Sequence, residues 1–266
     1  MKNVAPQTPV RSLIRFRPMA IGLLEKRKIR FWDELDRTLD ELIPRELMGD
    51  FLEEVAYARL PAPDTDWNAM PMYFLADYLT AEHRDFLVHE ISDITHILDV
   101  HTLSDADGVE GLRKLQRGFH DFVKECHLHF EEEEIYLFPK VLRYEACLRD
   151  HRVHPEFHKG SVQSHLASRS TQDGKRALHS LSVLTGWAQE HAKAHAGSVA
   201  ARDLLDLLTR FLARFQAHVK LEAEVLFPVA TELERNLYNL SIDGDPAVAF
   251  HRRGPMDSGI LRLEDL

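Results

Sequence analysis

The sequence predicts an all-α protein, an up-down-up-down four-helix bundle preceded by a helical N-terminal attachment. Apolar residues recur every three or four positions over long stretches, which is the spacing of one helix face. The alternation of apolar and polar residues that is typical of a half-buried strand is almost absent after residue 62. Two segments also share the pattern H-x-x-x-E-x-x-x-x-F-P, which indicates a helical feature that occurs twice.

Residues 1–62 are expected to form the attachment, a basic arm followed by two helices. The arm covers about the first 18 residues, contains three prolines and has no predicted core. The first helix is expected over 21–42, where Pro44 ends it, and the second over 45–59. A Pro-Ala-Pro-Asp linker follows at 61–64.

Residues 63–236 are expected to form the bundle, and residues 237–266 a loosely ordered tail. The four helices are predicted over 71–101, 109–148, 176–196 and from 198 or 203 to 236. The third helix is the least regular, because the preceding segment 150–174 is polar, rich in histidine and interrupted by proline and glycine. That segment is either a long loop or a poor extension of the helix.

Composition argues against several classes of protein. A net charge of −10 opposes the binding of nucleic acid or an anionic membrane surface, and no apolar run approaches the ~20 residues that span a bilayer. A cytoplasmic protein is therefore expected. The two cysteines form no C-x-x-C pair, whereas 15 of the 16 histidines fall between His83 and His218. The many clustered histidines and the scarcity of cysteine favour a metal site with nitrogen and oxygen ligands.

The repeated motif places a histidine and a glutamate on one helix face. His129 precedes Glu133 by four residues, and His218 precedes Glu222 by four, so each pair lies side by side on its helix. All four residues also lie in the apolar stripes that should face the bundle core. A glutamate buried there without a partner would be strongly unfavourable. A metal cation would satisfy both pairs; the alternative is two buried His–Glu pairs without metal.

His83 is the third histidine that lies in an apolar stripe. It lies 23 residues before position 106, in the expected turn between the first two helices, and His129 lies 23 residues after it. In antiparallel helices the two side chains therefore reach the same height. This agreement places His83 at the same site as the two motifs.

The ligand from the third helix is not fixed by the sequence. The 89-residue offset between the motifs, applied to His83, projects it to about position 172, where there is no histidine. His191 lies in the apolar stripe of its helix, whereas His179 lies closer to the projected height. His165 and His158 are further alternatives. His191 is the ligand predicted here.

These residues resemble the hemerythrin-like domain, and within that family they are most similar to the di-iron proteins that repair iron centres. The resemblance covers about 66–235 and rests on His83, the two H-x-x-x-E motifs and their F-P tails. It implies a non-haem di-iron centre in which His83, His129 and His218 are terminal ligands. Glu133 and Glu222 would bridge the two irons. The adjacent cysteines of the repair proteins have no counterpart in residues 1–62.

The expected function is therefore that of a non-haem di-iron protein that binds or reacts with a small diatomic ligand, O2 or NO. Its role would be sensing, detoxification or iron-centre repair. The alternative is a metal- or oxygen-responsive regulatory module without turnover, whose N-terminal helices contact a protein partner. Zinc or manganese would also suit these nitrogen and oxygen ligands.

Overall fold

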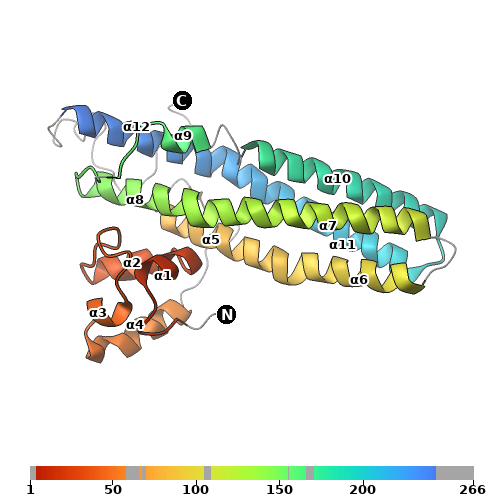
Figure 1. Ribbon diagram of the computed structural model, residues 1–266, viewed down its shortest axis with the longest axis horizontal. Helices are drawn as coiled ribbons and strands as arrows, with labels where there is room; N and C mark the ends of the chain where they lie inside the picture. The colour runs from red at the N-terminus through yellow and green to blue at the C-terminus, as the bar shows by residue number, and fades with distance from the viewer. Residues whose placement is uncertain are drawn as a thin grey trace. The chain divides into compact units, whose positions relative to one another are not determined.

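The described part of the computed structural model consists of helices joined by turns (Figure 1). It comprises residues 4–57, 66–67, 70–104, 109–154, 156–165 and 171–243. Within these ranges there is no β-strand, so the predicted all-α class is confirmed. None of the described helices combines the length and apolar character that a membrane span requires.

The chain divides into two compact units. Unit 1 comprises the described residues of 1–80, 134–164 and 225–266, and unit 2 those of 81–133 and 165–224. Helix α5 (Met72–Asp85) crosses this division and supplies residues to both units. Every residue of the buried His–Glu group described below belongs to unit 2.

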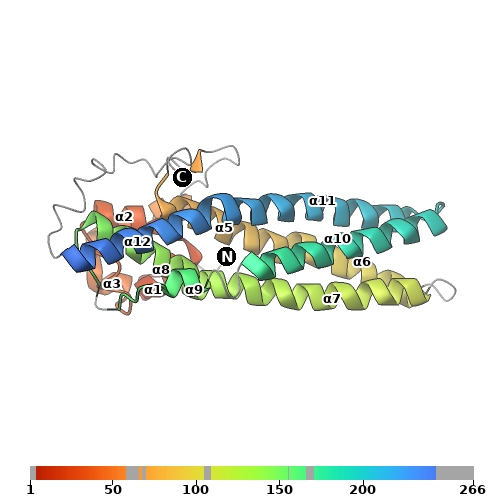
Figure 2. The ribbon, with the colours of Figure 1, turned by 90° about the horizontal axis from the view of Figure 1, so that it is seen from above.

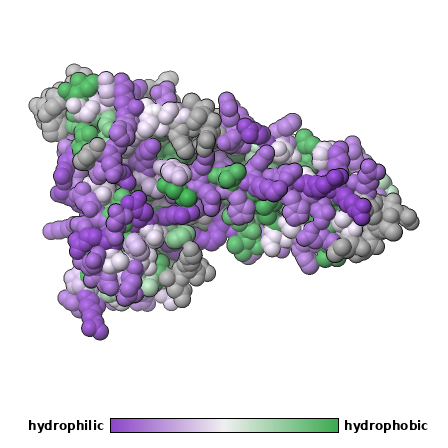
Figure 3. Space-filling model, in the orientation of Figure 1, coloured by the Kyte–Doolittle hydropathy of each residue, from purple (hydrophilic) through white to green (hydrophobic). Residues whose placement is uncertain are grey.

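Unit 2 is built from long helices that lie side by side (Figures 1 and 2). The helix α6 packs against α7 and α11, and α10 packs against the same two helices. The elements are the end of α5, η2 (Phe86–Glu90), α6 (Ile91–Ser104), α7 (Val109–Glu132), α10 (Thr171–Ala194) and α11 (Val199–Leu221). Hydrophilic residues cover most of the surface that these helices present in Figure 3, as the amphipathic sequence predicts.

The core of unit 2 is rich in phenylalanine. The ring of Phe122 lies 5.8 Å from Phe211 and 6.0 Å from Phe215, in edge-to-face contact, which is a favourable arrangement for aromatic pairs. Helix α7 comes close to α10 at Gly118, where a Cβ atom would lie only 2.9 Å from a methyl group of Leu184. The core is therefore packed without spare volume at this crossing.

Unit 1 contains the N-terminal helices and the two helices that begin with the F-P tails. Helix α8 packs against α12 and α1, and α4 packs against α2 and α3. The elements are α1 (Val10–Phe16), α2 (Ala20–Lys26), α3 (Leu39–Leu42), α4 (Arg45–Tyr57), α8 (Phe138–Arg149), α9 (Ser161–His165) and α12 (Phe227–Asp243).

Buried carboxylates in unit 1 hold backbone amides. The carboxylate of Glu145 accepts a hydrogen bond from the Met72 amide at 3.0 Å, and that of Glu234 accepts one from Val162 at 2.9 Å. Burial raises the pKa of Glu145, which the hydrogen bond from Met72 partly offsets. These side chains have structural partners, in contrast to the carboxylates of unit 2 described below.

The N-terminal region differs from the prediction in two ways. The first 18 residues are not an arm without a core, because α1 buries Val10, Leu13 and Ile14 at helical spacing. The helix expected over 21–42 is interrupted after Lys26, and Lys28 has a positive φ of 61° that no α-helix accommodates. Further along the chain, α12 continues to residue 243, and the remainder of the expected tail lies outside the described residues.

Candidate metal centre

The two helices predicted over the repeated motifs are interrupted by π-helical turns. These are η3 (Glu133–Leu137) and η5 (Glu222–Leu226), and each begins at the motif glutamate. A proline follows each turn, at Pro139 and Pro228. Because proline lacks an N–H and its ring clashes with the carbonyl four residues earlier, a helix that contains it must bulge. The F-P tails therefore account for a distortion that begins at each glutamate, and π-helical turns are frequent at functional sites.

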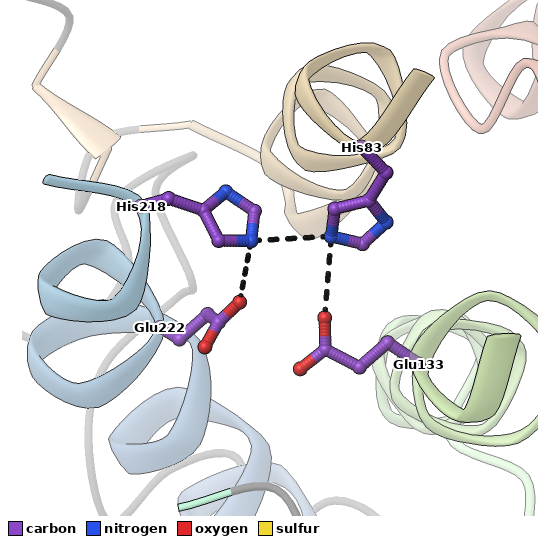
Figure 4. Close-up of side chains that lie close together, drawn as sticks. All are labelled: His83, Glu133, His218 and Glu222. Carbon is purple, nitrogen blue, oxygen red and sulfur yellow. Dashed lines mark hydrogen bonds and ion pairs between the residues drawn. The ribbon is translucent and has the colours of Figure 1, made fainter. Parts of the chain in front are cut away.

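Four buried side chains from different parts of unit 2 point toward one another (Figure 4). His83 comes from α5, Glu133 from η3, His218 from α11 and Glu222 from η5, and one ligand atom of each lies within 4.8 Å of the others. All four side chains are at most 1% exposed. The group therefore offers two imidazole nitrogens and two carboxylates in a space that water does not reach.

The distances within the group are short. Nε2 of His218 lies 2.7 Å from Oε1 of Glu222 and 3.2 Å from Nε2 of His83. Nε2 of His83 in turn lies 3.4 Å from Oε2 of Glu133. Donor atoms this close, contributed by three segments of the chain, converge on a common centre.

His129 lies beside this group and contacts both carboxylates. Its Nε2 atom is 3.9 Å from Oε1 of Glu133 and 3.7 Å from Oε1 of Glu222. Glu133 therefore directs one oxygen toward His83 and the other toward His129. A carboxylate in this arrangement can bridge two metal positions.

Several of the buried polar atoms are unsatisfied by the protein. Among the described residues, both oxygens of Glu133, Oε1 of Glu222 and Nε2 of His129 have no hydrogen bond of good geometry, although Oε1 of Glu222 forms an ion pair with Nε2 of His218 at 2.7 Å. Such atoms are rare in native proteins, because each loses its hydration without compensation. A metal cation would coordinate all of them, and imidazole and carboxylate together suit iron, zinc or manganese. The residues present therefore fit a metal ion.

Protons occupy part of this group when metal is absent. Burial lowers the pKa of His83 to about 4, so this imidazole is neutral. For His218 and His129, burial also acts to lower the pKa, but the charges of Glu222 and Glu133 outweigh it and raise the pKa to about 10 and about 9. The two imidazolium groups balance the two carboxylates, and metal must displace their protons to bind.

A carboxylate outside the group fixes the orientation of one imidazole. Nδ1–H of His218 donates to Oε2 of Glu82 at 3.1 Å, which leaves Nε2 of the neutral imidazole free to bind metal. Oε1 of Glu82 lies 3.9 Å from the Arg214 guanidinium, which also pairs with Asp85 at 2.9 Å. Glu82 was not among the residues predicted from the sequence. Its contact with His218 depends on the packing of two helices that are far apart in the sequence.

Phenylalanine rings cover the imidazoles. The ring of Phe130 stacks on His83 with centroids 4.1 Å apart and an interplanar angle of 11°. The ring of Phe215 lies 6.1 Å from His218 at 19°, and Phe86 meets the same imidazole edge-on at 5.5 Å. These rings hold the imidazole planes and exclude water from the histidine side of the group.

The predicted ligand from the third helix is not at this group. His191 lies 17 residues after Gly174 on α10, roughly 25 Å along the helix axis, and its ring contacts His195 at 4.3 Å. The side chains of the alternatives His179 and His158 are exposed, and that of His165 lies outside the described residues.

Gly174 occupies the height that the sequence offset projected. A Cβ atom there would lie 3.5 Å from Cγ1 of Val219 and 3.7 Å from Oε2 of Glu222. Helix α10 thus reaches the group with a residue that has no side chain. Height along the helix therefore predicted better than helix face which part of α10 lies beside Glu222.

The structure thus brings five of the six predicted ligands together and leaves out His191. The five are His83, His129, Glu133, His218 and Glu222. In comparisons with known proteins, no family model matches this chain and no curated protein matches its sequence. The assignment of a function therefore depends on the chemistry of this group.

Proposed function

We propose that this chain is a non-haem di-iron protein that binds or reacts with a small diatomic ligand, O2 or NO. In this proposal α5 with α6, α7, α10 and α11 form an up-down-up-down bundle of the hemerythrin-like kind. His83, His218 and the two carboxylates would hold one metal ion. His129, together with the same two carboxylates, would hold the second.

The observation that carries the proposal is the arrangement of Glu133. Its two oxygens face different histidines, 3.4 Å from His83 and 3.9 Å from His129, and neither oxygen has a hydrogen bond. A carboxylate that binds a single ion either uses one oxygen or turns both oxygens toward that ion. A carboxylate between two metal ions directs its oxygens toward different positions, as in the carboxylate-bridged sites of helix bundles.

The choice of iron rests on the resemblance of the two motifs to the hemerythrin-like domain. Imidazole and carboxylate ligands bind zinc and manganese as well. Iron would supply a change of oxidation state coupled to the binding of a diatomic ligand, and the surrounding polarity and access would tune it.

The residues of this chain have separate tasks in such a centre. Glu133 and Glu222 supply negative charge to the cations, while Glu82 keeps the proton of His218 on Nδ1. Phe130 and Phe215 hold the imidazoles and exclude water. Low polarity around the group strengthens each of these electrostatic contacts.

Metal analysis of the purified protein tests the proposal. We expect about two iron ions per chain after anaerobic reconstitution with ferrous iron, and a new absorption band on exposure to O2 or NO. Zinc and manganese are titrated in parallel to compare the metals. A chain that binds no metal, or one ion with undiminished affinity after Glu133→Gln, contradicts the proposal.

Neighbouring glutamates provide matched controls. Glu131 and Glu224 are exposed residues on the same helical segments, so Glu131→Gln and Glu224→Gln remove a charge without reaching the centre. Glu133→Gln and Glu222→Gln are expected to lose bound metal, while the two control variants keep the full content. Equal losses in all four variants would indicate a general effect of charge.

A further inference from the structure

The helix that carries His83 is followed by a third π-helical turn, which has no proline to cause it. This turn is η2 (Phe86–Glu90), where the Ile91 amide donates to the carbonyl of Phe86, five residues earlier. The sequence contains no proline between residues 72 and 138, so the explanation given for η3 and η5 does not apply. Because isolated π-turns are rare and interrupt a more regular helix, other contacts must hold η2 in place.

Arg214 of α11 contacts residues at both ends of this turn. Its guanidinium pairs with Asp85 at 2.9 Å, immediately before η2, and also with Glu90, the last residue of η2. The same group lies 5.0 Å from the ring centre of Phe86, the first residue of η2, which is a favourable cation–π distance. Of the two carboxylates, Glu90 is the less exposed, at 15% against 44% for Asp85, so its ion pair is the less screened by solvent.

The spacing of these two carboxylates matches a π-turn and not an α-helix. At 3.6 residues per turn, residues five apart in an α-helix point about 140° away from each other around the axis. In a π-turn the i, i+5 hydrogen bond places such residues almost one above the other. Asp85 and Glu90 are five residues apart, so η2 brings both to one side of the helix, where a single guanidinium pairs with them. The two ion pairs therefore stabilise the π-turn against the regular helix.

Arg214 also contacts the two side chains that hold the imidazole of His218 from outside the His–Glu group. Oε1 of Glu82 lies 3.9 Å from the guanidinium, and Oε2 of the same carboxylate accepts Nδ1–H of His218. Phe86, over which the guanidinium lies, meets that imidazole edge-on at 5.5 Å. Arg214 and His218 are four residues apart and so lie on the same face of α11. A change in η2 would therefore displace side chains that contact a predicted metal ligand.

We propose that Arg214 is a positioning residue, which holds η2 in its π-turn and thereby keeps the neighbours of His218 in place. Those neighbours are Glu82 and Phe86. The inference rests on the proposed function, and it adds a residue that controls metal affinity without binding metal. Arginine suits this task, because its guanidinium is always charged and has five N–H donors in a planar fork that can serve several carboxylates. A lysine would keep the charge but would pair with fewer carboxylates at once.

Substitutions at two arginines of α11 test this proposal. Arg214→Gln removes the charge and the fork, whereas Arg214→Lys keeps the charge alone. The matched control is Arg210→Gln, because Arg210 is an exposed residue one turn earlier on the same helix. Each variant is compared with the wild type by zinc calorimetry, by urea unfolding of the metal-free protein, and by the proton NMR signal of the His218 Nδ1–H. The NMR signal reports the hydrogen bond to Glu82 directly.

The expected effect is a loss of metal affinity that follows the loss of this hydrogen bond. Zinc affinity should fall about tenfold in Arg214→Gln relative to Arg210→Gln, within the usual range for groups that orient metal ligands. The Nδ1–H signal of His218 should broaden or disappear, because its proton exchanges with water once Glu82 moves away. Arg214→Lys should recover part of the affinity. In a Glu82→Ala background, Arg214→Gln should add less than about threefold, because effects that act through one residue are not additive.

The outcomes separate this inference from the proposed function. A wild-type protein that binds neither zinc nor iron contradicts the proposed function, and the Nδ1–H signal of the metal-free variants then decides the role of Arg214. Equal zinc affinities in Arg214→Gln and Arg210→Gln, or fully additive losses with Glu82→Ala, overturn that role. A loss of affinity with an unchanged Nδ1–H signal also overturns it, because it would indicate general destabilisation. If Arg214→Gln does not fold, the same comparison between Arg214→Lys and Arg210→Lys decides.

Discussion

Removal of the Glu82 carboxylate should weaken metal binding without removing any metal ligand. In Glu82→Ala, Nδ1–H of His218 loses the acceptor that lies 3.1 Å away. The imidazole can then rotate or adopt the wrong tautomer, with Nε2 protonated. Both changes oppose coordination through Nε2.

The magnitude follows from the kind of hydrogen bond that is lost. A hydrogen bond to a charged group contributes about 1.5–3 kcal/mol, and Glu82 is largely buried, with a side chain that is 15% exposed. Outer-shell partners of metal ligands typically change affinity by about 10–100-fold, or roughly 1.4–2.7 kcal/mol. The two ranges agree on a loss of about 2 kcal/mol. Glu82→Gln keeps an acceptor oxygen and should lose about half as much.

Calorimetric titration of the metal-free protein with zinc, which is redox-inactive, measures this loss directly. The matched control is Asp85→Asn, because Asp85 shares the Arg214 contact with Glu82 but is 44% exposed and does not hold His218. Urea unfolding of the metal-free variants reports any separate loss of stability. Equal zinc affinities for Glu82→Ala and Asp85→Asn would refute the reasoning.

Three further predictions concern protons, packing and the third helix. Because His129 and His218 have pKa values of about 9 and about 10, metal binding at pH 7 should release about two protons. Affinity should therefore rise from pH 7 to pH 9, and calorimetry in two buffers of different ionisation enthalpy counts the protons. The same raised pKa values stabilise the metal-free fold fully below about pH 6.5, the ordinary histidine value. This contribution is lost as the pH rises through about 9 and about 10, which thermal unfolding of the metal-free protein can follow. Gly118→Ala should be less stable than Gly111→Ala by about 1–3 kcal/mol, because its Cβ meets a leucine methyl of α10 at 2.9 Å. In Gly111→Ala, where nothing lies within 4 Å, a gain of about 0.5–1 kcal/mol is expected in the same unfolding assay. His191→Ala should leave metal content unchanged by elemental analysis, and a loss of metal would place that histidine at the centre.

The features that the sequence predicted well are those that a helix determines locally. The i, i+4 spacing of His129 and Glu133 puts both side chains on one face, whatever the rest of the chain does. His83 was selected because it lies in an apolar stripe, and its distance to the turn agreed with that of His129, since antiparallel helices rise by the same amount per residue. Both arguments need only helix geometry, and the structure places these residues together.

The features that the sequence missed depend on packing between helices. The third helix begins at Thr171, five residues earlier than predicted, and this extension carries Gly174 to the centre. The proximity of Gly174 to Glu222 could not be predicted, because glycine has no side chain of a ligand type. The link between Glu82 and His218 joins residues that are 136 positions apart, which no local pattern reveals.

The complete burial of the ligand group has a consequence for the rate at which metal is exchanged. A chelator in solution cannot contact an ion that is surrounded by side chains at most 1% exposed. Release would have to wait for a local opening of the helices, whose frequency is set by the stability of unit 2. Loss of metal would then be independent of chelator concentration and would accelerate with any variant that loosens the phenylalanine core. The metal found in the protein would reflect what was present while the chain folded, and a weaker-binding ion could persist there for as long as the helices stay closed.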